Sequence, residues 1–375
     1  MRSLRDRFDV EWATGASAGR ERLVYDRRLT RRGWLGTAFL LGTCRSTLRA
    51  EPEASSRHVF RSRHMGTEFT LLMECDRKEV ARRVAESAWK RVAELEQIFT
   101  DYDGASEARR LAASAPHRSA VPVSRELWTV CRYARTISEQ TCGAFDVTIG
   151  PLTRLWRRAH QRKRLPDPKR LAEAKEGVGY RFLVIDADHP KIQLTRPGMR
   201  LDFGGIAKGY ALDEVLRTVQ SAGIERALIN GGGDLACLEP PHGACGWPVR
   251  IPAWFEPTPP PIRYLPPDSA VATSGDRWKF LEVEGKRYSH LIDPRTGWAV
   301  IGRRQASVLA ERGMESDALA SAFTIMDPTD AARCAASRRG VGAWLAVEAS
   351  GEVRQFRVGP RAAWFRPSAS RKQMP

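Results

Sequence analysis

The chain has 375 residues, of which 42% are hydrophobic, enough for one large folded domain or two of ordinary size. Lysine and arginine number 61 against 44 acidic residues, and the resulting net charge of +17 favours anionic partners, although an arginine-rich genome gives the same balance. No basic run is interleaved with aromatic residues, which argues against nucleic-acid binding. The seven cysteines include no CxxC pair, so a zinc site or disulfide framework is not expected. A single disulfide between Cys237 and Cys245 remains an alternative that the sequence does not decide.

Residues 1–57 are expected to be an export-signal-like segment followed by a polar linker. Arg31 and Arg32 precede a short apolar run over 34–41, a pattern that resembles a twin-arginine export signal. The run is too short to span a bilayer. Cys44 follows it and weakly resembles a site of lipid attachment. We therefore expect a location in the cell envelope, periplasmic or membrane-anchored, with the cytoplasm as the alternative.

Periodic patterns typical of a folded domain begin at residue 58, and we expect this domain to end at 360, with 361–375 as a tail. Phe69, Leu71 and Met73 alternate as in a strand. Apolar residues over 79–99 share one helical face. Ser124 is placed to cap a second helix.

Strands and helices then follow one another irregularly. We expect a short helix with Pro168 in its first turn, strands over 181–188 and 191–196, and a helix from near Ile206 to Gly223. Strands on either side of the glycines within 225–238 should follow, and then a proline-rich surface loop over 252–267. The last expected elements are a hairpin turning at Glu284–Gly285, a helix over 315–326 and a final hairpin through Ser350–Gly351. There is no regular βαβ alternation, so the fold class is α+β.

The stretch LDFGGIAKGYALD begins at residue 201 and contains three glycines near the start of a predicted helix. It matches neither GxxxxGK[ST] nor GxGxxG. Gly204 and Gly205 allow close approach of the backbone or positive φ, and the following helix N-terminus could face an anion. Lys208 and Asp213 add polar reach. Taken alone, a glycine pair before a helix is more often a turn.

The stretch ESDALASAF places Asp317 and Ser321 four residues apart, on one face of a helix. A carboxylate and a hydroxyl together offer the hard oxygen ligands that Mg²⁺ prefers. The alternative is structural, because an aspartate near a helix N-terminus is favourable without any metal.

The stretch YSHLIDPRTGWAV contains a candidate general base. Tyr288, His290 and Ile292 alternate on a predicted strand, just before a turn over 293–297. A histidine there could accept a proton near neutral pH, although a lone histidine is more often structural. In CGAFDVTIG, Asp146 lies in a cluster of glycine, aromatic and small polar residues that fits either a ligand wall or a packed corner.

Seven short motifs, taken in order, resemble those of the FAD:protein FMN transferase family, also called ApbE. They are MGT (65–67), CGAFD with TIGPL (142–152), LDFGGIAKGYALD (201–213), NGGGD (230–234), ATSGD (272–276), SHLIDPRTG (289–297) and SDALASA (316–322). The resemblance covers residues 58–360. It implies a single α+β domain with two lobes and FAD held in the cleft between them.

The resemblance also implies an enzyme. FMN would pass from FAD to a threonine hydroxyl of a target protein in a Mg²⁺-dependent reaction that releases AMP. We expect the target to be an electron-transfer subunit of the cell envelope. An FAD pyrophosphatase that yields FMN and AMP is the nearest alternative, and a non-catalytic flavin-binding lipoprotein is a lower one.

Site residues follow from the resemblance. His290 corresponds to the catalytic base. Asp317, Ser321 and the backbone carbonyl of Ala207 correspond to the metal ligands, with serine where the family usually has threonine. The positions that line the FAD site are Met65, Tyr102, Ala144, Phe145, Asp146, Gly204, Tyr210 and Leu291, and Lys208 beside them is a possible anion contact. An asparagine that the family commonly carries soon after SE at 106–107 is absent, which bears on the flavin-side loop and on transfer versus hydrolysis.

Overall fold

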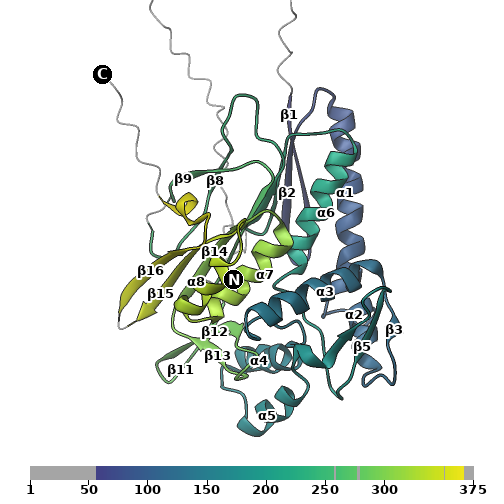
Figure 1. The fold of residues 1–375 in the computed structure, drawn as a ribbon, viewed down its shortest axis with the longest axis vertical. Helices are drawn as coiled ribbons and strands as arrows, with labels where there is room; N and C mark the ends of the chain where they lie inside the picture. Colours follow the sequence, from purple (N-terminus) through teal and green to yellow (C-terminus); the bar gives the residue numbers. More distant parts are fainter. Residues whose placement is uncertain (1–55, 257–258, 277–278, 350, 367–375) are drawn as a thin grey trace, which may run out of the picture.

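The computed structural model describes residues 56–366 except 257–258, 277–278 and 350. Its centre is an antiparallel eight-stranded sheet in the order β1-β2-β6-β7-β10-β14-β15-β16 (Figure 1). These strands are β1 (Arg57–His64), β2 (Thr67–Glu74), β6 (Ala227–Gly231), β7 (Asp234–Cys237), β10 (Ser269–Gly275), β14 (Arg304–Ala310), β15 (Gly342–Ala349) and β16 (Glu352–Val358). The mixture of helices with this sheet confirms the predicted α+β class.

Eight α-helices lie within the described residues. They are α1 (Lys78–Phe99), α2 (Glu107–Ala113), α3 (Arg125–Gln140), α4 (Gly150–Arg162), α5 (Pro168–Glu176), α6 (Ala207–Ser221), α7 (Gly313–Ile325) and α8 (Pro328–Ala336). Three smaller sheets complete the fold: β3 (Val121–Pro122), β5 (Lys191–Leu194) and β4 (Leu183–Ile185); β8 (Trp247–Arg250) with β9 (Ile262–Leu265); and β11 (Phe280–Val283), β12 (Lys286–Ile292) and β13 (Ala299–Ile301).

The two faces of the central sheet bury different side chains, as the period of two requires. On β2, Phe69, Leu71 and Met73 are fully buried in the large core that also contains α1, α6 and α7. Leu72 faces the other way, into a smaller core closed by β8 and by η3 (Ala362–Phe365). Phe365 of η3 is fully buried, so the packed structure extends beyond residue 360.

A separate small core lies below the main sheet, where α4 and α5 pack on β11, β12 and β13 (Figure 1). Its members include Leu152, Trp156, Tyr288 and Ile292. The predicted division of the domain into two parts is therefore confirmed in the fold. The chain boundaries 1–57, 58–360 and 361–375 stay predictions, and Arg31, Arg32 and Cys44 lie outside the described residues.

Most predicted elements are found, and the differences have physical reasons. The proline-rich stretch 252–267 is not entirely loop, because residues 262–265 form β9, which has no interior proline. Residues 150–162 form α4, a helix that was not predicted; Pro151 lies in its first turn, where a missing N–H costs nothing. Cys237 and Cys245 are free thiols. Among the described helices, none is both long and apolar enough to cross a bilayer.

Candidate active site

Helices α6 and α7 cross at their glycines. A Cβ atom on Gly209 would lie 2.1 Å from the carbonyl oxygen of Gly313, so the two backbones are in direct contact. Asp213 reinforces the crossing, since its carboxylate accepts hydrogen bonds from the N–H groups of Gly313 at 2.6 Å and Met314 at 3.0 Å. These N–H groups belong to the first turn of α7 and have no partner within the helix. Asp213 therefore caps α7 and does not reach toward a ligand.

A buried ion cluster of Lys208, Asp234 and Asp317 lies next to this crossing of α6 and α7. Lys208 Nζ pairs with the carboxylate of Asp234 and lies 3.4 Å from both carboxylate oxygens of Asp317. The Gly209 N–H donates to Asp317 Oδ2 at 3.0 Å. Asp234 and Asp317 are only 4% and 5% exposed. The structure thus assigns Lys208 to two carboxylates of the chain itself.

Burial dominates the electrostatics of this cluster. It raises the pKa of Asp317 to about 6, against the opposing effect of the Lys208 ammonium. Burial alone would lower the pKa of Lys208, but Asp234 and Asp317 outweigh it and the pKa is raised. A further cation beside Asp317 would favour its ionised form.

The glycine pair that precedes α6 lies against α7. A Cβ atom on Gly205 would be 2.6 Å from Ser321 Oγ and 3.4 Å from the ring of Phe145, so a side chain there would cover the serine hydroxyl. Neither Gly204 nor Gly205 has positive φ, so the pair is not explained by an unusual backbone conformation. The close approach of Ser321 to Gly205 explains the absence of a side chain there. Gly204 is exposed, and its N–H donates to Asp202 Oδ1 at 2.9 Å.

Asp317 and Ser321 lie on one face of α7, as predicted, and Ala207 is the first residue of α6. In the part of the chain that the structure describes, no group of three or more His, Cys, Asp or Glu side chains is placed to hold a metal ion. A metal bound here would therefore depend on one carboxylate together with hydroxyl and carbonyl oxygens. These are hard donors of the kind that Mg²⁺ takes.

The CGAFD loop forms a packed corner. Asp146 is 6% exposed, and its carboxylate accepts hydrogen bonds from Thr148 N–H at 2.8 Å, from the Thr148 hydroxyl at 2.7 Å and from Tyr180 N–H at 2.7 Å. Burial raises the pKa of Asp146. Ala144 and Phe145 are buried beside it. The side chain of Asp146 is thus used to fix the loop.

Tyr102 is the most exposed of the predicted FAD-site residues, at 82%. The guanidinium of Arg157 lies over its ring, 4.6 Å from the centroid, and donates to Asp202 Oδ2 at 3.0 Å. Arg157 also pairs with Asp101. Sequence reasoning missed Arg157 because it lies on α4, the helix that was not expected. It joins Tyr102 to the loop that contains Gly204.

Of two further positions predicted for the FAD site, Tyr210 lies in the main core and Met65 is half-buried against it. Tyr210 is 8% exposed and meets Phe99 edge-to-face at 5.9 Å. Met65 is a turn residue between β1 and β2 with φ of 49°, followed by Gly66 with φ of 73°. This turn type needs two residues with positive φ, which explains the glycine.

His290 lies on β12, where the predicted alternation is broken. Tyr288 and Ile292 are buried, yet His290 between them is exposed. The pairing of β12 with β13 shifts register between Tyr288 and Ile292, and such a bulge turns side chains away from their expected face. Leu291, the remaining predicted position, is half-buried beside it.

The tautomer of His290 follows from its partner. Nδ1 lies 3.1 Å from the carbonyl oxygen of Lys279, which can only accept, so the neutral ring carries its proton on Nδ1 and leaves the Nε2 lone pair free. Desolvation by the surrounding chain lowers the pKa of His290 to about 4, although the side chain still meets solvent. The ring is therefore neutral at pH 7 and able to accept a proton.

Several contacts bring the predicted motifs together. Gly143 of the CGAFD loop lies 3.7 Å, measured from an ideal Cβ, from Arg295 in the turn after β12. Trp156 Nε1 donates to Gly297 O in the same turn at 2.9 Å. The structure thus gathers motifs whose contacting residues are 152 and 141 positions apart in the sequence.

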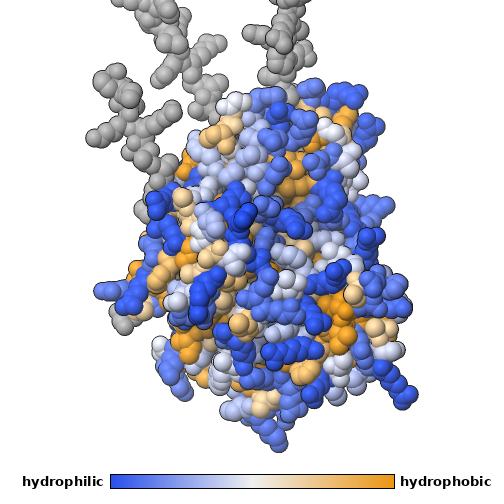
Figure 2. Space-filling view, viewed as in Figure 1, coloured by the Kyte–Doolittle hydropathy of each residue, from blue (hydrophilic) through white to orange (hydrophobic). Residues whose placement is uncertain are grey.

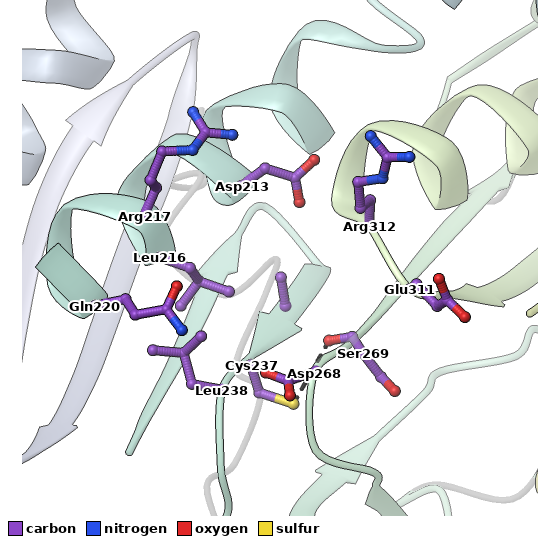
Figure 3. Close-up of a pocket in the computed structure, with 11 residues that line it drawn as sticks. Asp213, Leu216, Arg217, Gln220, Cys237, Leu238, Asp268, Ser269, Glu311 and Arg312 are labelled. Atoms are coloured by element: carbon purple, nitrogen blue, oxygen red, sulfur yellow. Dashed lines mark hydrogen bonds between the residues drawn. The ribbon is translucent and has the colours of Figure 1, made fainter. Parts of the chain in front are cut away.

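The pocket drawn in Figure 3 is a different place. It has a volume of about 200 Å³ and lies between the C-terminal half of α6, β7 and the segment that leads into α7. Asp213 and Arg312 line it from α6 and from the start of α7. None of the predicted site residues lines it.

Comparison with known proteins gives a consistent result. Residues 65–345 match the model of the ApbE family. The FAD:protein FMN transferase of Treponema pallidum (strain Nichols) is 30% identical over 266 residues, which cover 62% of this chain and 71% of that protein. The FAD:protein FMN transferase of Salmonella typhimurium is 29% identical, over 84% of this chain and 91% of that protein.

Solved structures agree on the fold. The ApbE protein from Thermotoga maritima is 27% identical with a TM-score of 0.71, over 80% of this chain and 97% of that one. The apo flavinyl transferase ApbE from Pseudomonas stutzeri has a TM-score of 0.72 at 24% identity, over 82% of this chain and 96% of that one. The family model, the relatives and the fold agree: the chain belongs to the ApbE family.

Proposed function

We propose that this enzyme transfers FMN from FAD to a threonine hydroxyl of a target protein and releases AMP. Its membership of a family whose relatives are named FAD:protein FMN transferases supports flavin transfer. The observation that carries the proposal is the pairing of the buried carboxylate of Asp317 with the half-buried hydroxyl of Ser321 on one face of α7, next to a glycine loop that leaves the hydroxyl uncovered. With a divalent cation bound to these oxygens, such a site would suit the phosphates of a dinucleotide.

The residues present fit a Mg²⁺ ion. Asp317 would hold it with its carboxylate, Ser321 with its hydroxyl and Ala207 with its backbone carbonyl. An ideal Cβ at position 205 would occupy the space beside Ser321 Oγ, so the glycine keeps that donor open. A bound Mg²⁺ would neutralise charge on the pyrophosphate of FAD.

The transfer step exchanges one P–O bond for another. The threonine oxygen forms a bond to the phosphorus of the FMN half, and the bond between this phosphorus and the bridging oxygen breaks. That oxygen leaves on AMP. The threonine proton passes to Nε2 of His290, whose lone pair is free because Nδ1 faces the Lys279 carbonyl. FAD would lie between the two parts of the domain, with exposed Tyr102 beside it.

Hydrolysis of FAD to FMN and AMP is the second candidate, and one observation favours it. His290 is exposed, so a water molecule can occupy the position of the acceptor hydroxyl. The same His290 nitrogen would accept the proton of that water. The two reactions differ only in the acceptor oxygen.

One experiment separates them. Purified protein is incubated with FAD and Mg²⁺, with and without an envelope fraction that contains acceptor proteins. Transfer predicts a flavin-fluorescent protein band on a denaturing gel, whereas hydrolysis predicts FMN and AMP by chromatography in both samples. Omitting Mg²⁺ should abolish either product. FAD binding with neither product would contradict catalysis.

We also propose that the chain acts in the cell envelope on an electron-transfer subunit. The support is the pair Arg31–Arg32 before a short apolar run, and Cys44 after it. Mass spectrometry of the mature N-terminus tests export and lipid attachment at Cys44. An intact, unmodified N-terminus on protein from the membrane-free cell extract would contradict this location.

A further inference from the structure

The outer side of α4 carries an unusual concentration of positive charge. Residues 154–170 contain eight lysine and arginine residues and one acidic residue, Asp167. Arg154, Arg158 and Arg162 follow one another at intervals of four, so they form one stripe along the helix, which we call the α4 stripe. All three are exposed. The stripe continues past the helix end into Lys163 and Arg164, which are also exposed.

The α4 stripe has no counter-charges within the described residues. Arg157, on a neighbouring face of the helix, is paired with Asp101 and Asp202, but Arg154, Arg158 and Arg162 form no ion pair with any described carboxylate. Like charges at i, i+4 destabilise a helix, and no ion pair with a described carboxylate offsets this repulsion. Of the three arginines, only Arg162, in the last turn, gains from the helix dipole.

The other sides of α4 face the proposed reaction site. Trp156 packs on Tyr288 of β12 with ring centroids 5.9 Å apart, two residues from His290 on the same strand. Arg157 covers Tyr102. A helix with its side chains is roughly 10 Å across, so the stripe lies about one helix width from the proposed base.

We propose that the α4 stripe binds an acidic segment of the protein that accepts FMN, next to its acceptor threonine. The inference rests on the proposed function. An acceptor whose hydroxyl meets His290 must place neighbouring residues over the lower end of the molecule, where α4 and α5 lie (Figure 1) and where most of the visible surface is hydrophilic (Figure 2). Carboxylates there would meet unpaired guanidinium groups, which bind carboxylates in bidentate geometry.

The test compares two variants with the same loss of charge. In the first, Arg154, Arg158 and Arg162 are replaced by glutamine, which keeps helix propensity. In the control, three exposed cations of α1 that also lack ion pairs with described carboxylates are replaced by glutamine, namely Lys78, Arg83 and Lys90. Helix α1 lies toward the opposite end of the molecule (Figure 1). Thermal melting should show that both variants fold.

Binding is measured with a labelled peptide that contains one threonine between aspartates, and with the same peptide carrying asparagines. By fluorescence anisotropy at low salt, the full-length protein should prefer the aspartate peptide. The α4 variant should bind it about tenfold more weakly and the α1 variant almost normally. Equal weakening in both variants, or none in the α4 variant, overturns the proposal, as does equal binding of both peptides by the unaltered protein.

Two further measurements exclude other occupants of the stripe. FAD binding, followed by flavin fluorescence, should be unchanged in the α4 variant, and its loss would place the stripe in the FAD site and overturn the proposal. Vesicles of phosphatidylcholine with phosphatidylglycerol test a membrane role. If the α4 variant loses vesicle binding but keeps peptide binding, the stripe faces lipid and the proposal is wrong. Failure of the unaltered protein to form any covalent flavin product would contradict the proposed function, independently of peptide binding.

Discussion

The two chemical ends of the candidate site are built in opposite ways. Asp317 lies in the core, 5% exposed, with its carboxylate held by a lysine and a backbone N–H. His290 lies at the rim, on a bulged strand of a three-stranded sheet, and its side chain meets solvent. One end is closed and crowded with charge, and the other is open and neutral.

This contrast matches the two reactants of the proposed transfer. The pyrophosphate of FAD needs fixed charges in a dry place, because electrostatic stabilisation is strongest where water is excluded. A protein acceptor needs access, which a buried base would not allow. An exposed histidine with a low pKa gives access without adding positive charge.

The largest effect is expected at the buried end. Replacing Asp317 by asparagine keeps the volume and an acceptor for the Gly209 N–H but removes the charge. We expect flavin transfer to fall by about 10³-fold, the range seen when transition-state charge stabilisation is lost. In-gel flavin fluorescence measures the product against time.

Asp317→Ala should be at least as inactive and also less stable, because Lys208 then keeps only Asp234 as a partner. Glu315 on the same helix is a matched control, since it pairs with Arg338 away from the site and Glu315→Gln should keep transfer. If Asp317→Asn transfers FMN at the normal rate, the Asp317 carboxylate takes no part in the reaction.

At the open end, His290→Gln should reduce transfer by about 10²-fold and leave FAD binding unchanged, because a general base contributes only to the chemical step. The pH profile is the sharper test. The base must be neutral, and the pKa of His290 is about 4, so its contribution is present above that value and is lost as the pH falls through it. Transfer should therefore not decline between pH 8 and 5.5 on account of this group. A decline near pH 6.5 that disappears in His290→Gln would contradict the lowered pKa.

Sequence patterns were sufficient for the elements that carry the site. Helix α7 begins within two residues of its expected start, and Asp317 and Ser321 share a face because the spacing of four is set by helix geometry. The Ser124 hydroxyl caps α3 as predicted, by accepting from Leu127 N–H at 3.2 Å. Local rules predict such features because all the atoms involved are close in the chain.

Features that depend on distant partners could not be predicted in this way. Lys208 was considered as an anion contact, but the identity of its anions follows from Asp234 and Asp317, up to 109 residues away. The bulge at His290 depends on the pairing of β12 with β13. No sequence pattern indicated Arg157, because its contact with Tyr102 forms only when α4 brings the two side chains together.

The geometry of the buried end should depend on the contact between α6 and α7. Gly209→Ala places a Cβ atom 2.1 Å from Gly313 O, so the helices must separate. We expect a loss of about 2 kcal/mol in the free energy of unfolding, typical of overpacking, with weaker transfer because Asp317 shifts relative to Ala207. Denaturant titration measures the first effect.

Gly104→Ala is the control for this variant, because a Cβ atom at Gly104 meets no other heavy atom within 4 Å and φ there is not positive. It should leave both stability and transfer near normal. If Gly209→Ala is as stable as Gly104→Ala, the two helices have room to separate and the close crossing is not required.

The smallest effect is expected where the two ends are joined. Arg157 on α4 contacts Tyr102 and Asp202, so it ties an exposed ring to the glycine loop of the buried end. Arg157→Lys keeps the charge but loses the flat guanidinium that can stack on the ring and bond Asp202 at once. We expect the KM for FAD to rise several-fold and kcat to change little, since Arg157 is placed to orient the binding surface and not to touch the reacting atoms. Arg83→Lys on α1, an exposed arginine with neither contact, serves as the control. An equal fall in kcat with unchanged KM would instead mean that Arg157 acts in the transition state, and the open and buried ends would then share a catalytic cation.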